Sequence, residues 1–500
     1  MTTPRGDSYD IVVIGAGLGG LTAAAFLARA GRQVLVIERQ EEVGGLAQSL
    51  RRGPYRFDSG LYATSFGSVE PSLHTLLNEL GVGDRVEWIR CPPPLYSGFF
   101  GDERVDVPFG VESYSHALKE LFPHESAGID SFIELTTRLT RELEKPRPKG
   151  SAEDLRTASE TFETILTYRH ATLGEVLDAH LSDARLKALI GANWPNLALP
   201  PSRLSYVAWS GMTTIRVEDG QYYCAGGFHN LAEALAAAVE MHGGEIMRGT
   251  EVTGITLRDG SVAGVTLGDQ EVRAEAVVSN GDLLSTYESL VGLEHLPARL
   301  VRQLRKLHPS LSAFTVYTAT TLDLARTGLG HVTFAYPSWN LDESYAGSFA
   351  GEPTSMMIAI PSLTDRSLSP PGHHVLMATA LVAADARQWS EDEETVTAEI
   401  LDRLDRIMPG FSHSLVQAET STPQTVELRT GNHAGAMYGW ANSPDQVAAR
   451  RPANDAPIDG LYLAGHWTQP GSGSIAVIFS GLRAAQLALG ERAEHLGASV

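Results

Sequence analysis

The clearest pattern along the chain is a pair of short apolar runs separated by a glycine-rich turn. Residues 9–15 read YDIVVIG and residues 33–38 read QVLVIE. Runs of this length are typical of strands buried on both faces of a parallel sheet. Between them, residues 21–30 predict a helix that ends at Gly31. Together they form a βαβ unit of about 30 residues.

The same stretch, residues 11–30, also has the length of a signal peptide or a spanning helix. It contains four glycines between positions 15 and 20, and neither a basic region before it nor a cleavage site after it supports processing. We therefore expect a strand and a helix, no targeting segment and a cytoplasmic protein, with weak peripheral membrane contact left open.

Helical and strand-like patterns alternate further along the chain. Helical periodicity covers residues 110–190, 230–242 and 472–489, whereas residues 252–265 and 272–278 alternate as in a β-meander and residues 460–465 predict another buried strand. Residues 95–100 (LYSGFF) read as an apolar loop. We expect this loop to pack between two lobes; a substrate entrance or a membrane-dipping edge are the alternatives.

Composition and charge exclude several classes of protein. Hydrophobic residues make up 43% of the 500 residues, which is ordinary for a globular protein. The formal charge of −21 disfavours nucleic acid as a partner. The two cysteines, Cys91 and Cys224, are too few for a disulfide framework or a structural zinc site. The acidic run 391–394 predicts a helix start with Ser390 as its N-cap, and we expect no metal site.

A dinucleotide-binding motif lies in the first turn. Gly15-x-Gly17-x-x-Gly20 follows a strand and opens a helix, and Glu38 stands 23 residues after Gly15. The three glycines permit the tight turn, the approach of a pyrophosphate and close helix–sheet packing. Glu38 would accept hydrogen bonds from ribose hydroxyls and repel a 2′-phosphate, which disfavours NADP. A glycine-rich turn without a ligand is the alternative.

Motifs spread over nearly the whole chain extend this picture. They are Gly44-Gly45, Phe57–Gly60, Tyr223-x-x-Gly226-Gly227, Glu251–Ile255, Val277–Asn280, Thr422-Pro423, Tyr438–Trp440 and Gly460–Gly473. With these motifs the sequence resembles the FAD-dependent amine-oxidase superfamily. More narrowly, it resembles the phytoene desaturase, carotenoid isomerase and retinol saturase group.

The resemblance implies an α/β fold with two interleaved domains. One is a Rossmann-type FAD-binding domain with a parallel sheet and a β-meander, and the other is a mixed α+β substrate domain. The FAD-binding domain would comprise residues 1–95, 221–285 and 426–500, and the substrate domain residues 96–220, which are helical, and 286–425.

The resemblance also implies which residues hold the cofactor, which would be non-covalent FAD. They are Gly15, Ala16, Gly17, Gly19, Gly20, Glu38, Arg39, Gly44, Gly45, Leu46, Gly60, Val252, Asn280, Gly465, His466, Ser474, Ile475 and Ala476. The helix that opens near Ser474 would direct its N-terminal N–H groups at the flavin N1/O2 position. The C-terminal motif contains no cysteine that could form a thioether to the flavin.

Three positions depart from the pattern of the relatives. Leu46 stands where many carry arginine, Cys224 where proline is frequent, and His466 where an acid is frequent. These departures leave cofactor binding intact and put the substrate in doubt.

The catalytic candidates are His466, Trp467 and Tyr438. His466 could contact the cofactor, which we favour, or transfer a proton. The resemblance implies that Tyr438 and Trp440 belong to an aromatic wall. Arg216 and Glu218 could face the substrate chamber, although we expect a solvated ion pair.

Three functions are consistent with the sequence. The leading one is an FAD-dependent oxidoreductase that acts on carbon–carbon bonds of a small apolar isoprenoid or polyene substrate by desaturation, saturation or isomerisation. An amine or amino-acid oxidase is the second, although no lysine lies in a flavin motif. The third is a prenyl-lipid escort protein without catalysis.

Overall fold

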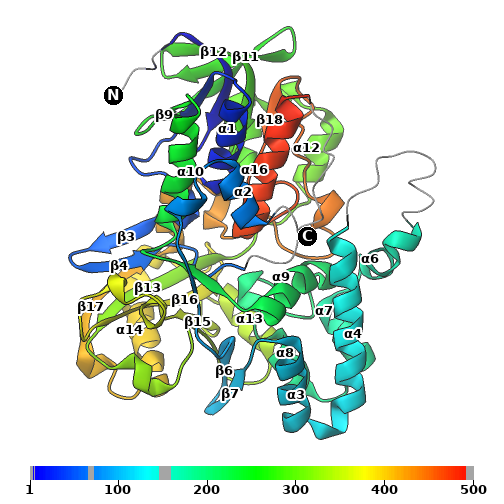
Figure 1. The fold of residues 1–500 in the computed structure, drawn as a ribbon, viewed down its shortest axis with the longest axis vertical. Helices are drawn as coiled ribbons and strands as arrows, with labels where there is room; N and C mark the ends of the chain where they lie inside the picture. Colours follow the sequence, from blue (N-terminus) through cyan, green and yellow to red (C-terminus); the bar gives the residue numbers. More distant parts are fainter. Residues whose placement is uncertain (1–3, 5, 66–71, 146–158, 491–500) are drawn as a thin grey trace.

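The computed structural model describes residues 4, 6–65, 72–145 and 159–490. In this part of the chain two seven-stranded sheets lie one above the other along the long axis of the molecule (Figure 1). The upper sheet contains β1 (Ser8–Ile14), β2 (Val34–Ile37), β9 (Glu245–Met247), β10 (Gly254–Arg258), β11 (Ser261–Leu267), β12 (Gln270–Ser279) and β18 (Leu461–Leu463). The lower sheet contains β6 (Tyr96–Phe100), β7 (Glu103–Val107), β13 (Ser312–Thr320), β14 (Val332–Tyr336), β15 (Met356–Ala359), β16 (His374–Val382) and β17 (Leu415–Ser421).

The upper sheet brings five parallel strands, β18, β12, β1, β2 and β9, to a common edge. Its order is β10-β11-β12-β1-β2-β9, and β18 pairs with β12. Ile14, the last residue of β1, pairs with Ile37 and Ser279, and Ser279 pairs in turn with Leu463. The carboxyl ends of strands from the start, middle and end of the sequence therefore meet. In open α/β sheets, ligands bind beyond such an edge.

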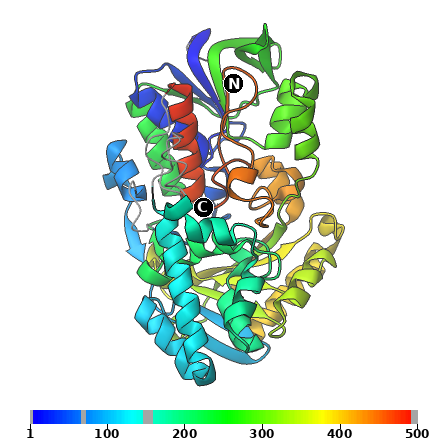
Figure 2. The same cartoon turned by 90° about the vertical axis from the view of Figure 1, so that its right-hand side faces the viewer.

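Two helices at this edge pack unusually closely. They are α1 (Leu18–Arg29) and α16 (Ser474–Ala488), seen side by side in blue and red in Figures 1 and 2. A Cβ atom on Gly481 of α16 would lie only 2.0 Å from the carbonyl oxygen of Gly19 in α1. Likewise, a Cβ on Gly20 would lie 2.1 Å from the carbonyl oxygen of Gly15. Glycine at these positions lets both helices begin next to each other at the strand ends.

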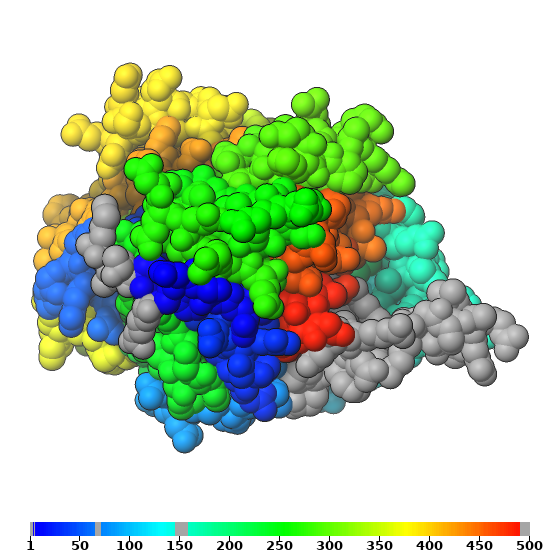
Figure 3. Space-filling model, turned by 90° about the horizontal axis from the view of Figure 1, so that it is seen from above, coloured from blue at the N-terminus to red at the C-terminus, as the bar shows by residue number. Residues whose placement is uncertain are grey.

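Residues distant in sequence share the upper half of the molecule. Helix α10 (His229–Met241) packs beside α1, and viewed from above the blue N-terminal residues lie between green central and red C-terminal ones (Figure 3). The α/β fold class predicted from the sequence is confirmed. The residue limits given for the two domains stay a prediction.

The lower sheet corrects one expectation from the sequence. Residues 95–100, predicted as a loop, contain strand β6, which pairs with β7 and β14. Its aromatic side chains are interior: Phe100 stacks on Trp339 with ring centroids 3.8 Å apart, and the Tyr96 hydroxyl donates to the carbonyl of Leu189. An apolar run of this length fits a buried strand as well as a loop, and the pairing decides.

Helix α14 (Trp389–Ile407) covers the lower sheet with Val396, Ile400 and Leu404, which are spaced four residues apart. Its acidic first turn was predicted, but the predicted cap was wrong. The helix begins at Trp389 with Gln388 at the N-cap, so Ser390 already lies inside the first turn.

A helical layer completes the lower half. It comprises α3 (Val111–Leu121), α4 (Ser126–Leu143), α6 (Glu163–Tyr168), α7 (Leu173–His180), α8 (Ala184–Gly191) and α9 (Tyr206–Asp219). The remaining longer helices are α2 (Leu73–Glu79), α12 (Ala298–Leu304), α13 (Leu341–Phe349) and α15 (Pro423–Thr430). Two small antiparallel sheets pair β3 (Ser49–Arg52) with β4 (Tyr55–Asp58) and β5 (Trp88–Arg90) with β8 (Tyr222–Cys224). Within the described ranges, no helix combines the length and apolarity needed to span a bilayer.

Candidate active site

Two adjoining cavities lie at and below the carboxyl edge of the upper sheet. The first, here the edge cavity, has a volume of about 430 Å³ and runs along the strand ends. The second, here the inner cavity, has a volume of about 190 Å³ and lies against α9. Both are lined by Gly60, Leu61, Tyr438, Gly473 and Ser474. A ligand in one can therefore contact a ligand in the other.

Backbone at glycines forms one wall of the edge cavity. Gly15 and Gly44 have φ angles of +89° and +114°, values that L-residues rarely adopt. The Gly44 N–H donates to the carbonyl of Ala16 at 2.8 Å, which lays the Gly44-Gly45 loop across the first turn. A Cβ on Gly45 would approach the Cα of Gly17 to 3.5 Å. The two glycine motifs thus form one compact backbone surface.

The side chain of Asn280 leaves no room for a Cβ atom at three further glycine positions. This side chain follows β12 and lies so close that a Cβ would approach its amide to 2.8 Å from Gly17, 2.6 Å from Gly19 and 2.9 Å from Gly465. Its Oδ1 atom is buried and has no hydrogen-bond partner among the described residues. A buried acceptor without a donor at the cavity wall is a feature that a bound polar molecule would complete.

Glu38 presents its carboxylate at the end of β2. The side chain is 8% exposed and accepts hydrogen bonds from the N–H groups of Ala16 at 2.7 Å and Gln40 at 2.8 Å. Each carboxylate oxygen accepts one of these bonds and keeps further lone pairs for ligand hydroxyls. The carboxylate is thereby oriented before any ligand arrives.

The edge cavity is bounded by two helix N-termini. Helix α1 starts after Gly17 and α16 after Gly473; neither has a side-chain cap or an acid in its first turn. The first N–H groups of a helix lack intrahelical partners and carry the positive end of its dipole. Two such ends on one cavity favour a long ligand with electron-rich groups at separate places.

These features fit a flavin dinucleotide. The cavity offers a carboxylate for ribose, uncapped N–H groups for a pyrophosphate, a backbone surface without side chains, and a second helix start toward the inner cavity. Residues of the described chain supply all four of these features.

Most residues predicted to hold the cofactor come together on these walls. The edge cavity is lined by Gly15, Gly17, Gly19, Glu38, Arg39, Gly44, Gly45, Leu46, Gly60, Val252, Asn280, Gly465, His466 and Ser474. Ile475 and Ala476 line the inner cavity instead. Ala16 and Gly20 line neither and support the turn from behind. Sequence reasoning missed Asp282, Arg429 and Asn432, which belong to no motif and reach the wall only through the fold.

His466 lies on the wall of the edge cavity as a neutral ring. Burial and the neighbouring Arg451 guanidinium lower the pKa of His466 to about 3, so the ring is neutral near pH 7. Its Nε2 lies 3.2 Å from Asn432 Oδ1. Trp467 donates to the same oxygen at 3.1 Å, is 2% exposed and lines neither cavity. The structure therefore sets Trp467 apart from the candidate active site.

Tyr438 lies at the junction of the two cavities. Its hydroxyl donates to the carbonyl of Pro195 at 2.9 Å, and burial raises the pKa of the phenol above its usual value of 10. The ring is thus held as a neutral wall. Of the predicted catalytic residues, Tyr438 and His466 reach the cavities.

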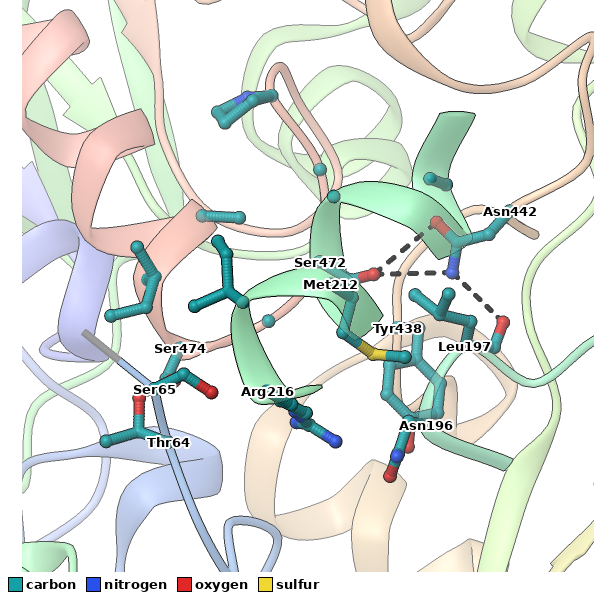
Figure 4. A pocket seen from close by; sticks show the side chains of 18 of the residues that line it. Thr64, Ser65, Asn196, Leu197, Met212, Arg216, Tyr438, Asn442, Ser472 and Ser474 are labelled. Carbon is teal, nitrogen blue, oxygen red and sulfur yellow. Dashed lines mark hydrogen bonds between the residues drawn. The ribbon is translucent and has the colours of Figure 1, made fainter. Parts of the chain in front are cut away.

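The inner cavity is lined mainly by apolar side chains. Helix α9 contributes one face, with Ala208, Gly211, Met212, Ile215 and Arg216 at helical spacing (Figure 4). Arg216 was expected in a solvated ion pair with Glu218; instead it lines this cavity, while Glu218 is exposed. The helical periodicity of the sequence did not predict which face of α9 would line the cavity.

The fold and the edge cavity define a dinucleotide-binding α/β protein. Residues 18–489 match the family described as flavin containing amine oxidoreductase, and the chain belongs to this family. It is a flavin-dependent oxidoreductase. Among the described residues, no group of three or more histidines, cysteines or carboxylates is arranged to hold a metal ion.

Relatives with known names show which members of this family the chain resembles. The chain is 27% identical over 496 residues to the chloroplastic prolycopene isomerase of Arabidopsis thaliana, covering 95% of this chain and 82% of the relative. It is 28% identical over 517 residues to the phytoene dehydrogenase of Streptomyces griseus, covering 98% and 97%. Putrescine oxidase bound to putrescine shares the fold, with a TM-score of 0.67 at 15% identity over 97% and 99% of the two chains. The resemblance stated from the motifs is confirmed.

Proposed function

We propose that this protein binds FAD non-covalently and moves hydride between the flavin and a carbon–carbon bond of an apolar polyene of the isoprenoid class. The observation that carries the proposal is the junction of two cavities at Tyr438 and the start of α16: one holds an oriented carboxylate and two helix N-termini, and the other is lined mainly by apolar side chains. Desaturation, saturation and redox-neutral isomerisation are the possible outcomes of such chemistry.

Each part of the cofactor has a counterpart on the wall. Glu38 would hold the ribose, the N–H groups after Gly17 the pyrophosphate, and Val252 the adenine. The N–H groups at Ser474 would face the pyrimidine side of the flavin. When bound, the flavin would supply a two-electron acceptor or donor at N5, and a helix N-terminus nearby favours negative charge on it.

The protein's own residues would bind, orient and exclude water. Tyr438 would hold the substrate against the flavin as a neutral aromatic wall. His466 would contact the cofactor as a neutral ring, because its lowered pKa leaves it unprotonated at physiological pH. Cys91 and Cys224 are buried and line neither cavity, which supports non-covalent binding.

Two further observations support this choice over the alternatives. An amine oxidase often uses a lysine near the flavin, and no lysine is among the described residues that line either cavity. An escort protein without flavin has no need of an open edge cavity with an oriented carboxylate. The relatives named for prolycopene and phytoene support a polyene substrate.

Anaerobic mixing of the flavin-loaded protein with candidate polyenes tests the proposal. We expect a polyene to change the flavin absorbance near ~450 nm, the band of oxidised flavin. Product mass then distinguishes loss of two hydrogens, gain of two, or neither. A protein that reacts with amines and with no polyene would contradict the proposal.

A further inference from the structure

Arg216 brings a positive charge into the inner cavity without a counter-ion. The side chain projects from α9 and is partly buried. Its one recorded hydrogen bond runs from Nη1 to the hydroxyl oxygen of Tyr62 at 3.2 Å. Among the described residues, no carboxylate forms an ion pair with it. A guanidinium has five N–H donors, and beyond this hydrogen bond the group lies over the Tyr62 ring, with its Cζ atom 6.0 Å from the ring centroid.

A second donor on the same wall also lacks a partner. Asn196 is 7% exposed, and its Oδ1 accepts a short hydrogen bond from the Tyr62 hydroxyl. Its Nδ2 is buried and has no hydrogen-bond partner among the described residues. Buried amide donors are normally satisfied, so this atom is a site where a partner is missing. The observation is independent of the charge on Arg216.

Tyr62 links the two donors into one group. Its hydroxyl receives a hydrogen bond from Arg216 and donates one to Asn196, so both side chains converge on the Tyr62 oxygen. Pro195, next to Asn196, accepts the hydroxyl of Tyr438. The group therefore lies beside the junction with the edge cavity.

These donors lie outside the edge cavity, which holds most of the residues predicted to bind the cofactor. Arg216, Asn196 and Tyr62 line the inner cavity and are absent from the walls of the edge cavity. What would complete them is an acceptor that enters with the substrate. A pure hydrocarbon polyene offers none, whereas a carboxylate or carbonyl oxygen offers lone pairs and negative charge.

We propose that the substrate is an amphipathic polyene with an oxygen acceptor at one end, a carboxylate or a carbonyl, and that Arg216 and Asn196 bind this end. The inference rests on the proposed function, because it assigns the polar part of the same substrate. The apolar wall of α9, with Met212 and Ile215, would hold the hydrocarbon part.

A matched set of three ligands tests the inference. The flavin-loaded protein is titrated with all-trans-retinoic acid, with retinal, and with the same polyene carrying methyl in place of the carboxylate, all in one detergent. Dissociation constants come from the change in flavin absorbance and from tryptophan fluorescence. We expect the carboxylate or the carbonyl to bind about tenfold to a hundredfold more tightly than the hydrocarbon, as for a hydrogen bond to a charged group. Which of the two binds more tightly identifies the acceptor.

Variants assign that preference to the residues. Arg216→Met should remove most of the preference for the two oxygen-bearing probes, and Arg216→Lys should retain part of it. Asn196→Leu should reduce the preference independently. Arg326→Met is the control, because that side chain is 88% exposed and lies more than one hundred residues after Arg216 in the sequence.

The outcomes separate this inference from the proposed function. Equal affinity for all three probes, or a preference that survives Arg216→Met, would overturn the inference and leave the proposed function standing. Failure of every probe to bind a protein that holds its flavin would overturn both.

Discussion

The edge cavity and the inner cavity adjoin but are built from different parts of the chain. Backbone at glycines and two helix N-termini form much of the edge cavity, whereas side chains from α4, α9 and the loops near Asn196 and Tyr438 form the inner one. A wall made of backbone fits one ligand shape, because a single Cβ added at one of its glycines would occupy space that the ligand or the neighbouring backbone needs. Side-chain walls can change with little effect on the fold. The cofactor and the substrate should therefore respond to different substitutions.

The largest effect is expected where backbone meets backbone. In Gly20→Ala the new Cβ would lie 2.1 Å from the carbonyl oxygen of Gly15, so α1 must move away from β1. We expect the free energy of unfolding to fall by about 3 kcal/mol or more and flavin content to fall with it. Calorimetry and the ratio of flavin to protein absorbance measure both.

The same substitution at Gly6 is the control. There a Cβ would approach no atom closer than 3.6 Å, so stability should change by less than ~0.5 kcal/mol. Similar losses at both glycines would mean that close packing at the first turn is not what shapes the edge cavity.

A smaller effect is expected at Glu38. Replacement by alanine removes the acceptor that Ala16 and Gln40 share with the proposed ribose contact. Flavin affinity should weaken about tenfold to a hundredfold, measured by titrating the flavin-free protein with FAD. Glu42→Ala, at an exposed neighbouring position, should leave the affinity unchanged.

The inner cavity should respond in the opposite way. Ile215→Trp adds a large side chain to its wall, away from the edge cavity. We expect flavin content to stay near that of the wild type while polyene binding weakens about tenfold, since a filled pocket excludes its ligand. Loss of flavin in this variant, compared with the exposed Leu166→Trp, would contradict the division between the cavities.

The smallest effect concerns His466 and pH. The pKa of His466 is lowered from 6.5 to about 3 in the folded protein. Between pH 6.5 and pH 3, the unfolded chain therefore binds a proton at this residue that the folded chain does not bind. This group therefore reduces stability below about pH 6.5, by at most about 1.4 kcal/mol per pH unit. The ring is partly exposed to the edge cavity, which diminishes the effect.

Urea unfolding of wild type and His466→Gln at pH 7 and pH 5 tests this sign. The wild type should lose about 1 kcal/mol more than the variant between the two pH values. Equal losses would indicate that His466 is protonated in the folded protein and would restore it as a proton donor.

The same division decides what could be predicted from the sequence. Gly15, Gly17, Gly44 and Glu38 form patterns because local backbone geometry requires them at fixed spacing, and the structure brings them to one wall. The sequence did not predict where the Arg216 side chain points, because this depends on how α9 packs against the rest of the protein. Asn196 and Asn432 carry no local pattern at all.

Two further differences between the sequence prediction and the structure have the same origin. Strand β6 was taken for a loop because an apolar run does not reveal its partners, one of which, β14, lies more than two hundred residues away. Trp467 follows a flavin motif in sequence, yet the turn after β18 directs its indole to Asn432 rather than to a cavity. Adjacent positions in a motif do not share a direction.

A crystal structure of the yellow, flavin-loaded protein tests the central claim most directly. The account predicts one FAD molecule along the edge cavity, with its pyrophosphate at the N-terminus of α1 and its isoalloxazine ring at the N-terminus of α16 beside Tyr438. Flavin density elsewhere, or helix starts that contact no part of the cofactor, would contradict it.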